Sequence, residues 1–228
     1  MNIAYLTSLL SSAVAVIIGI VVHESAHACC AYMLGDRTAR SQGRLSLNPL
    51  NHIDPFGTIL LPFIMIVAGG PVFAFAKPVP VSLANLGHPR RDEVLVSLAG
   101  PASNILLAVC CALLVRGMGL HPEVLLGLGA GVQRAIITFA LTGMSVNLSL
   151  AFFNLIPLPP LDGSSVLVLL LKGRALQTYC EIQRYAMPIL MVVLYVFPTM
   201  FHIDLIGWYF NVTVDPMYLG LLRFALGF

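Results

Sequence analysis

The sequence begins with a long apolar stretch, residues 3–33, in which no charged side chain precedes Glu24. An apolar run of about 18 residues or more is long enough to cross the hydrocarbon core of a bilayer as a helix. Lipid offers no hydrogen bonds to the backbone, so a segment of this kind must satisfy its own N–H and C=O groups. This stretch therefore predicts a membrane helix.

The rest of the chain continues the apolar pattern. Charged residues make up 10% of the 228 residues and hydrophobic residues 58%, whereas a soluble domain carries about 25% charged residues. Further apolar stretches occupy residues 94–115, 133–156, 185–200 and 205–228. We therefore expect an all-α polytopic membrane protein with about four to six membrane-embedded helices.

One apolar stretch, residues 56–76, is interrupted by prolines and glycines, among them Pro62 and Pro71. Its helical part would rise only about 18 Å, which is too short for a hydrocarbon core of about 30 Å. Prolines also remove backbone donors and favour extended backbone before them. For residues 56–81 we therefore expect a re-entrant helix followed by an extended strand.

Three polar residues inside the first apolar stretch form the pattern H-E-x-x-H, namely His23, Glu24 and His27. Residues i and i+4 of a helix share one face, so both imidazoles can reach one metal ion at about 2.0–2.1 Å. Zinc would lower the pKa of a bound water towards about 7, and Glu24 is near enough to take its proton. The alternative is hydrogen bonding between helices, but ionisable residues inside a membrane are typically functional.

Asp162 is the candidate for the third protein ligand that a catalytic zinc needs. It is the only carboxylate between Glu123 and Glu181, and it lies in the sequence Pro159-Pro160-Leu161-Asp162-Gly163. Irregular backbone of this kind is tolerated at membrane depth only where it is buried or lines a cavity. As an alternative, Asp162 would cap the helix that follows. The need for a third ligand favours the metal.

Three motifs occur together and in order: H-E-x-x-H at 23–27, A-G-P-A-S-N at 99–104, and N-x-x-P-x-P-P-L-D-G at 154–163. In this combination the sequence resembles the site-2 protease family of intramembrane zinc metalloproteases. Residues 46–57 and 76–81 are similar to its compact bacterial and archaeal branch, which has no PDZ or CBS domains.

The resemblance implies a zinc metalloendopeptidase that hydrolyses a peptide bond in or near a transmembrane segment of a substrate protein. It implies one Zn²⁺ per chain, held by His23, His27 and Asp162, with Glu24 as the acid and base. It also implies a single membrane protease domain over residues 1–228, with a catalytic core at about 7–171 and C-terminal helices at 175–228.

Three further residues are weaker candidates for binding the substrate or the oxyanion of the reaction. Asn104 would donate a hydrogen bond, and its alternative role is a contact between helices. His52 and Asn48 lie in the polar loop after the first helix, where a side chain can also be merely solvated. A neighbouring carboxylate, Asp54, is positioned to orient His52.

The location of the motifs predicts the topology. To share a metal, His27 and Asp162 must lie at similar depth, which requires an even number of crossings between them. Residues 94–115 and 133–156 supply two crossings, so 56–76 would enter and return. Most lysines and arginines then lie on the side of the motifs, and the positive-inside rule predicts an active site towards the cytoplasmic side of a prokaryotic cell membrane.

The alternative function is that of a non-catalytic multi-pass membrane protein, either a metal transporter or a pseudoprotease that binds clients. A transporter typically spreads ionisable residues along its spans, whereas here they concentrate in the H-E-x-x-H pattern and at Asp162. The expected partners are a membrane-protein substrate and the lipid bilayer. A net charge of +2 argues against nucleic acid, and the oligomeric state is left open.

Overall fold

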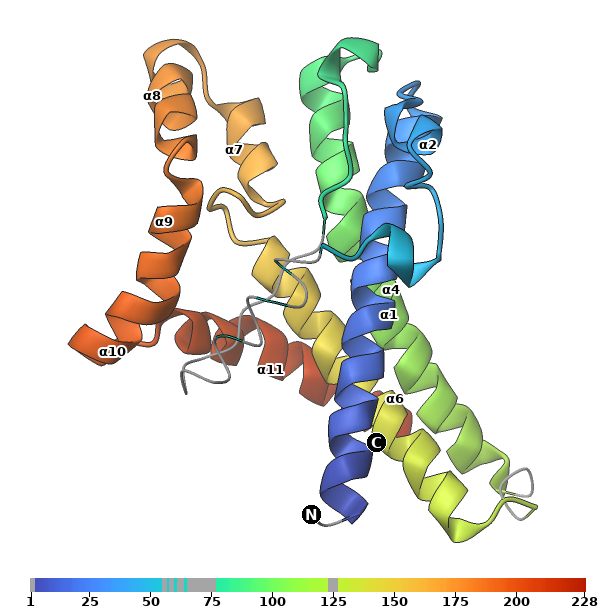
Figure 1. The fold of residues 1–228 in the computed structure, drawn as a ribbon. Helices are drawn as coiled ribbons and strands as arrows, with labels where there is room; N and C mark the ends of the chain where they lie inside the picture. The colour runs from blue at the N-terminus through green and yellow to red at the C-terminus, as the bar shows by residue number, and fades with distance from the viewer. Residues whose placement is uncertain (1–2, 55–56, 58–59, 61–63, 65–76, 123–126) are drawn as a thin grey trace. The chain divides into compact units, whose positions relative to one another are not determined.

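The computed structural model describes residues 3–54, 57, 60, 64, 77–122 and 127–228 (Figure 1). None of these residues forms a β-strand. Four longer helices are α1 (Ile3–Met33), α4 (Pro89–Leu120), α6 (Ala130–Asn154) and α11 (Leu205–Leu226). The shorter helical segments are α2 (Thr38–Ser41), η1 (Pro49–Asn51), η3 (Leu83–Asn85), α7 (Ser164–Leu170), α8 (Gly173–Gln183), α9 (Ala186–Met191), the π-helical η4 (Val192–Val196) and α10 (Phe197–Phe201).

Three of the described helices are long and apolar enough to cross a membrane: Thr7–Met33 of α1, all of α4 and all of α6. A bent pair, Gly173–Gln183 with Ala186–Phe201, supplies a fourth if it is counted as one span, although its two halves meet at 73°. Many large apolar side chains on these helices are exposed, as lipid-facing residues must be. The prediction of an all-α polytopic membrane protein is confirmed.

The predicted re-entrant helix and strand fall mostly outside the described residues, since these include only 57, 60 and 64 of the range 56–76. The end of the predicted strand, residues 77–81, is described and forms no β-strand. Pro78 and Pro80 account for this, because each lacks the backbone donor that a ladder requires.

The chain forms two compact units. The first consists of Met1–Gly19, Pro101–Asn154 and Ile206–Phe228, and the second of Ile20–Gly100 and Leu155–Leu205. The long helices α1 and α4 therefore contribute residues to both. The single protease domain expected over the whole chain stays a prediction.

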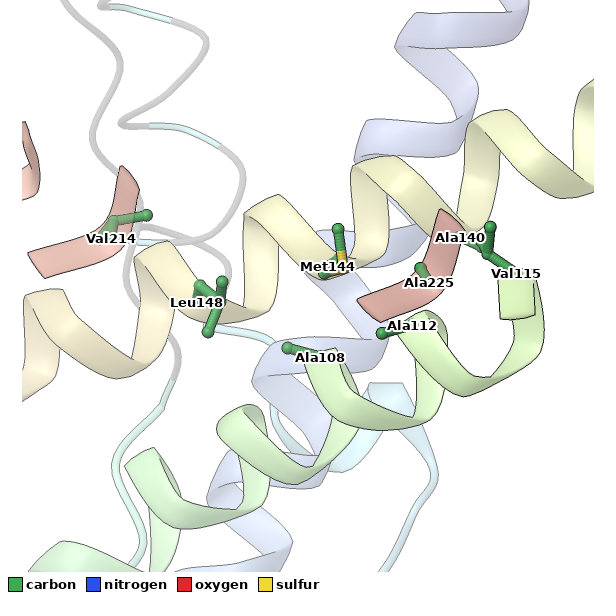
Figure 2. Close-up of a cluster of buried hydrophobic side chains, with 8 residues drawn as sticks. All are labelled: Ala108, Ala112, Val115, Ala140, Met144, Leu148, Val214 and Ala225. Carbon is green, nitrogen blue, oxygen red and sulfur yellow. The ribbon is translucent and has the colours of Figure 1, made fainter. Parts of the chain in front are cut away.

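The core of the first unit is a cluster of small and medium apolar side chains from three helices (Figure 2). Its members are Ala108, Ala112 and Val115 of α4, Ala140, Met144 and Leu148 of α6, and Val214 and Ala225 of α11. Small residues let helix backbones approach closely, which drives association in lipid, where apolar side chains gain little by leaving the solvent. A side-chain contact adds to this, because the Arg116 guanidinium donates to the Phe224 carbonyl and lies over its ring at 4.7 Å.

In the second unit, the buried carboxylate of Asp36 organises the chain that follows α1. The helix ends at Gly35, whose φ of +108° lies in the region that favours glycine. Asp36 then accepts hydrogen bonds from the Thr38 amide and hydroxyl at 3.0 and 2.5 Å. It also accepts from the Ser82 amide at 2.7 Å and the Asn85 amide group at 2.9 Å. These bonds fix the segment before α4 against the end of α1.

Asp36 predicts a specific loss of stability in acid. Burial opposes ionisation, but hydrogen bonds from Asn85, Thr38 and Ser82 outweigh it and lower the pKa of Asp36 to about 2. The carboxylate therefore stabilises the fold at pH values above its unfolded pKa of about 3.9, and this contribution disappears as pH falls towards 2. In Asp36→Asn, we expect the free energy of unfolding near pH 7 to fall by about 1.5–3 kcal/mol.

Thermal unfolding of the detergent-solubilised protein between pH 7 and pH 3 measures this effect. Asp36→Asn should lose less stability on acidification than wild type does. The matched control is Asp215→Asn, since Asp215 is exposed. Equal stability of Asp36→Asn and Asp215→Asn near pH 7 would contradict the role assigned to Asp36.

Candidate active site

Three side chains converge in the second unit. His23 and His27 lie one turn apart on α1, with their ring centroids 4.6 Å apart, and both are buried. Asp162 precedes α7, and its Oδ2 lies 3.0 Å from His23 Nε2 and 3.4 Å from His27 Nε2. One potential ligand atom from each residue lies within 4.8 Å of the others. The structure thus brings together the three residues that the sequence singled out as metal ligands.

The imidazole of His27 is oriented by the backbone of α4. Its Nδ1 lies 2.7 Å from the carbonyl oxygen of Val96. A carbonyl only accepts, so Nδ1 carries a hydrogen, and in the neutral ring that binds a metal the Nε2 lone pair lies on the side of Asp162. Metal-binding histidines commonly make such a second contact, which fixes both the tautomer and the ring orientation.

A tight turn of the backbone delivers Asp162. A side chain at Gly163 would collide with the carbonyl group of Leu155 and would lie 2.9 Å from the Ile156 oxygen, so only glycine fits. Helix α7 begins after Gly163 and has no side-chain cap. The alternative role of Asp162 as a capping residue is therefore not seen in the geometry.

The donor set fits zinc. Asp162 Oδ2 is buried and has no hydrogen-bond partner, although two imidazole nitrogens lie beside it. Burying a carboxylate oxygen in this way is unfavourable unless a cation or donor compensates it. Two imidazoles and one carboxylate form a ligand set found in catalytic zinc sites, which leaves a fourth position for water or substrate.

Gly100 of α4 lies directly against both histidines. A Cβ atom at this position would lie 2.6 Å from Cε1 and Nε2 of His23 and would collide with Nε2 of His27. The sequence identifies Gly100 only as part of the A-G-P-A-S-N motif, and this contact was not predicted. The glycine itself could have indicated the contact. Inside a helix, glycine is unfavourable by about 1 kcal/mol relative to alanine, so its presence indicates close packing.

Glu24 is half-buried on the same turn of α1. Its carboxylate interacts electrostatically with the side chains of His23, His27, Asp162 and His52. The predicted base therefore lies among the three candidate ligands, and His52 belongs to the same neighbourhood.

The structure buries His52 almost completely, with 2% of its surface exposed. Its Nε2 donates to the Ser46 carbonyl at 2.7 Å, and its buried Nδ1 has no hydrogen-bond partner. The Ser46 carbonyl therefore orients the His52 ring, and the orienting role predicted for Asp54 stays a prediction. The side chain of Asp54 accepts a hydrogen bond from the Gly57 amide at 2.7 Å.

Asn48 has a local structural role. It is exposed, and its Oδ1 accepts from the Leu50 amide at 3.1 Å, which caps the short helix η1. Asparagine is among the residues preferred at such a cap. This contact stabilises the loop that carries His52, and its predicted role in substrate binding stays a prediction.

Asn104 lies in the first unit and is fully buried. Its Nδ2 donates to the Gly19 carbonyl at 3.1 Å and to Asn147 Oδ1 at 2.8 Å, so both amide hydrogens are engaged. Asn147 in turn donates to the Gly143 carbonyl at 2.8 Å. These contacts correspond to the alternative of a link between helices. Asn147 was not singled out from the sequence, although an amide in an apolar run was visible.

Comparison with known proteins finds similarity to a peptidase family and to proteins named as zinc metalloproteases. The sequence model described as Peptidase family M50 matches residues 11–128 and 118–197. A Bacillus subtilis protein named "Putative zinc metalloprotease YwhC" is 40% identical over 186 residues, which cover 81% of this chain and 80% of that protein.

Two mycobacterial proteins, both called Rip2 and carrying the same description, are also similar. The Mycolicibacterium smegmatis protein is 28% identical over 87% of this chain and 72% of its own length. The Mycobacterium tuberculosis protein (strain H37Rv) is 31% identical over 86% of this chain and 68% of its own length. No solved structure matches the chain significantly. The chain therefore belongs to peptidase family M50, the site-2 protease family of zinc-dependent membrane metalloproteases.

Proposed function

We propose that this metalloprotease hydrolyses a peptide bond in or near a transmembrane segment of another protein. The observation that carries the proposal is the position of its polar cluster. His23, Glu24 and His27 lie within Thr7–Met33, a helix segment long and apolar enough to span a bilayer, and Asp162 meets the two histidines there. Substrates that approach a site at this depth are themselves membrane segments or lie next to one.

In this proposal His23, His27 and Asp162 hold the zinc ion. When bound, zinc supplies a Lewis acid that polarises the scissile carbonyl and makes water more acidic. The protein's own residues prepare this site: the Val96 carbonyl keeps Nε2 of His27 available, and Gly100 leaves room for both rings.

Glu24 moves the proton. Its carboxylate takes a proton from the water that attacks the scissile carbonyl carbon, and delivers it to the amine nitrogen as the C–N bond breaks. The reaction consumes one water, regenerates the Glu24 carboxylate and releases a carboxylic acid and an amine. A metal transporter has no need of this carboxylate beside the metal, and a pseudoprotease is expected to have lost it or a ligand.

We further propose that the active site lies towards the cytoplasmic side of a prokaryotic cell membrane. Helices α4 and α6 are each long and apolar enough to cross the membrane, and two crossings between His27 and Asp162, with residues 56–76 entering and returning as the sequence predicts, return both residues to one side. The loops on that side contain Arg37, Arg40, Arg44, Lys77, Arg90, Arg91, Lys172, Arg174 and Arg184, whereas the opposite side contains Arg116 and Arg134. Positive charge of this kind accumulates on the cytoplasmic side.

Cleavage of a model substrate tests both proposals. The purified protease would be reconstituted with a single-span protein of known orientation, and the products would be mapped by mass spectrometry. We expect cleavage in or next to the cytoplasmic half of the span, abolished by a zinc chelator and restored by added zinc. Cleavage only in a soluble domain far from the span would contradict intramembrane proteolysis, and cleavage in the opposite half would contradict the topology.

A further inference from the structure

The side chain of His52 is buried beside the active site, and the proposed function does not yet use it. Only 2% of its surface is exposed. Its electrostatic interaction with Glu24 places it near the carboxylate that moves the proton. Of its two ring nitrogens, one has a partner and the other has none.

The backbone fixes the tautomer of His52. Nε2 lies 2.7 Å from the carbonyl oxygen of Ser46, which only accepts hydrogen bonds, so Nε2 carries the proton. In the neutral ring, Nδ1 then presents a bare lone pair. This lone pair is buried and unpartnered, which is unfavourable unless a donor is supplied during function.

The loop that carries His52 is tied to the turn of α1 that carries Glu24. The Ser46 carbonyl accepts a second hydrogen bond, from the hydroxyl of Ser25 at 2.7 Å. Ser25 follows Glu24 directly in the sequence. One carbonyl oxygen thus couples the position of the imidazole to the position of the base.

We propose that His52 is an additional catalytic residue, whose Nδ1 accepts a hydrogen bond from the attacking water. This inference rests on the proposed proteolytic function. In this arrangement Glu24 removes one proton from the water, and His52 Nδ1 holds its other hydrogen. The oxygen lone pair is then directed at the scissile carbonyl carbon. His52 neither gains nor loses a proton in this step.

The tautomer also decides between this role and the oxyanion role expected from the sequence. A neutral His52 with its proton on Nε2 has no hydrogen on Nδ1 to donate to an oxyanion. Orienting the attacking water needs only an acceptor, which Nδ1 provides. Accurate orientation of reacting groups lowers the barrier of the chemical step rather than the affinity for substrate.

Two substitutions separate this catalytic role from simple support of the loop. Glutamine places its amide near the position of Nε2, so His52→Gln can still donate to the Ser46 carbonyl but lacks the acceptor at Nδ1. Asparagine places its amide oxygen near the position of Nδ1, so His52→Asn keeps an acceptor towards the water but loses the bond to Ser46. If His52 only supports the loop, His52→Gln should have the higher kcat of the two variants. If His52 orients the water, His52→Asn should have the higher kcat.

The test measures kcat and KM for a model single-span substrate, together with zinc content and thermal unfolding, in wild type and both variants. We expect His52→Gln to lower kcat by about 10-fold or more, within the range of proton-transfer and positioning effects. Its KM, zinc content and unfolding temperature should match wild type. His52→Asn should have a higher kcat than His52→Gln even where it is less stable.

Four results would overturn the proposal: a wild-type kcat in His52→Gln, a change confined to KM, a loss of zinc in His52→Gln, or a lower kcat in His52→Asn than in His52→Gln. Wild type and Glu24→Gln are assayed alongside. If wild type cleaves and Glu24→Gln does not, the proteolytic mechanism stands, and any of these four results rejects the role of His52 alone. If Glu24→Gln cleaves as wild type does, the proposed mechanism fails and the role of His52 fails with it.

Discussion

Replacing Glu24 by glutamine is expected to abolish cleavage while leaving the zinc site intact. Glutamine has nearly the same size as glutamate but cannot take a proton from water, and general acid–base catalysis contributes about 10²–10⁴-fold to rates. The candidate ligands His23, His27 and Asp162 are unchanged in this variant. We therefore expect kcat for a model membrane-span substrate to fall at least about 100-fold, with one zinc ion still bound.

The measurement combines a cleavage assay with metal analysis of the same purified samples. Glu181→Gln is the matched control, because Glu181 is exposed on α8 and far along the chain from the H-E-x-x-H pattern. The control should cleave as wild type does. Retention of the wild-type rate by Glu24→Gln would rule out its role as the acid and base, whereas loss of zinc from this variant would show that Glu24 helps to hold the metal.

Much of the candidate site was predictable, because its chemistry is local in the sequence. Two histidines four residues apart on a helix necessarily share a face, whatever the rest of the fold does. The third candidate ligand is 135 positions from His27 by residue number, yet Asp162 could be named because a catalytic zinc needs a third ligand and few carboxylates lie near membrane depth. The all-α class followed from apolar runs long enough to span a bilayer.

The contacts that orient these residues could not be predicted, because they depend on which segments meet in three dimensions. Sequence spacing gives no indication that the Val96 carbonyl accepts a hydrogen bond from His27. It also gives no indication that the Ser46 carbonyl accepts one from His52. Both acceptors are backbone atoms, which every residue possesses. Helix packing determines which carbonyl meets each histidine, and the side-chain types at positions 96 and 46 do not predict these contacts.

Asn104 shows how a motif residue can be identified while its contacts are not. The sequence placed its amide in an apolar helix, where a hydrogen-bond partner is strongly favoured, but left two possible partners. In the structure, the amide bonds to the Gly19 carbonyl and to Asn147. Gly19 belongs to the part of α1 that lies in the first unit, so this link attaches α4 to α1 within that unit.

The close approach of α4 to the two histidines leads to the second large effect. In Gly100→Ala, the added methyl carbon would lie 2.6 Å from His23 Nε2 and would collide with His27 Nε2. Carbon and nitrogen atoms do not approach this closely, so either the imidazoles or the helix must move. Since a displacement of about 1 Å at a reacting centre can lower a rate about 100-fold, we expect Gly100→Ala to lose most of its zinc affinity and cleavage activity.

Gly117→Ala is the matched control, because Gly117 lies on the same helix α4 and a Cβ there meets no atom within 4 Å. Alanine is favoured over glycine inside a helix by about 1 kcal/mol, so Gly117→Ala should bind zinc and cleave as wild type does, with equal or higher thermal stability. Helix propensity favours alanine at position 100 as well. A lower zinc affinity in Gly100→Ala alone would therefore isolate the steric effect on the two imidazoles, and wild-type zinc affinity in both variants would show that Gly100 does not shape the metal site.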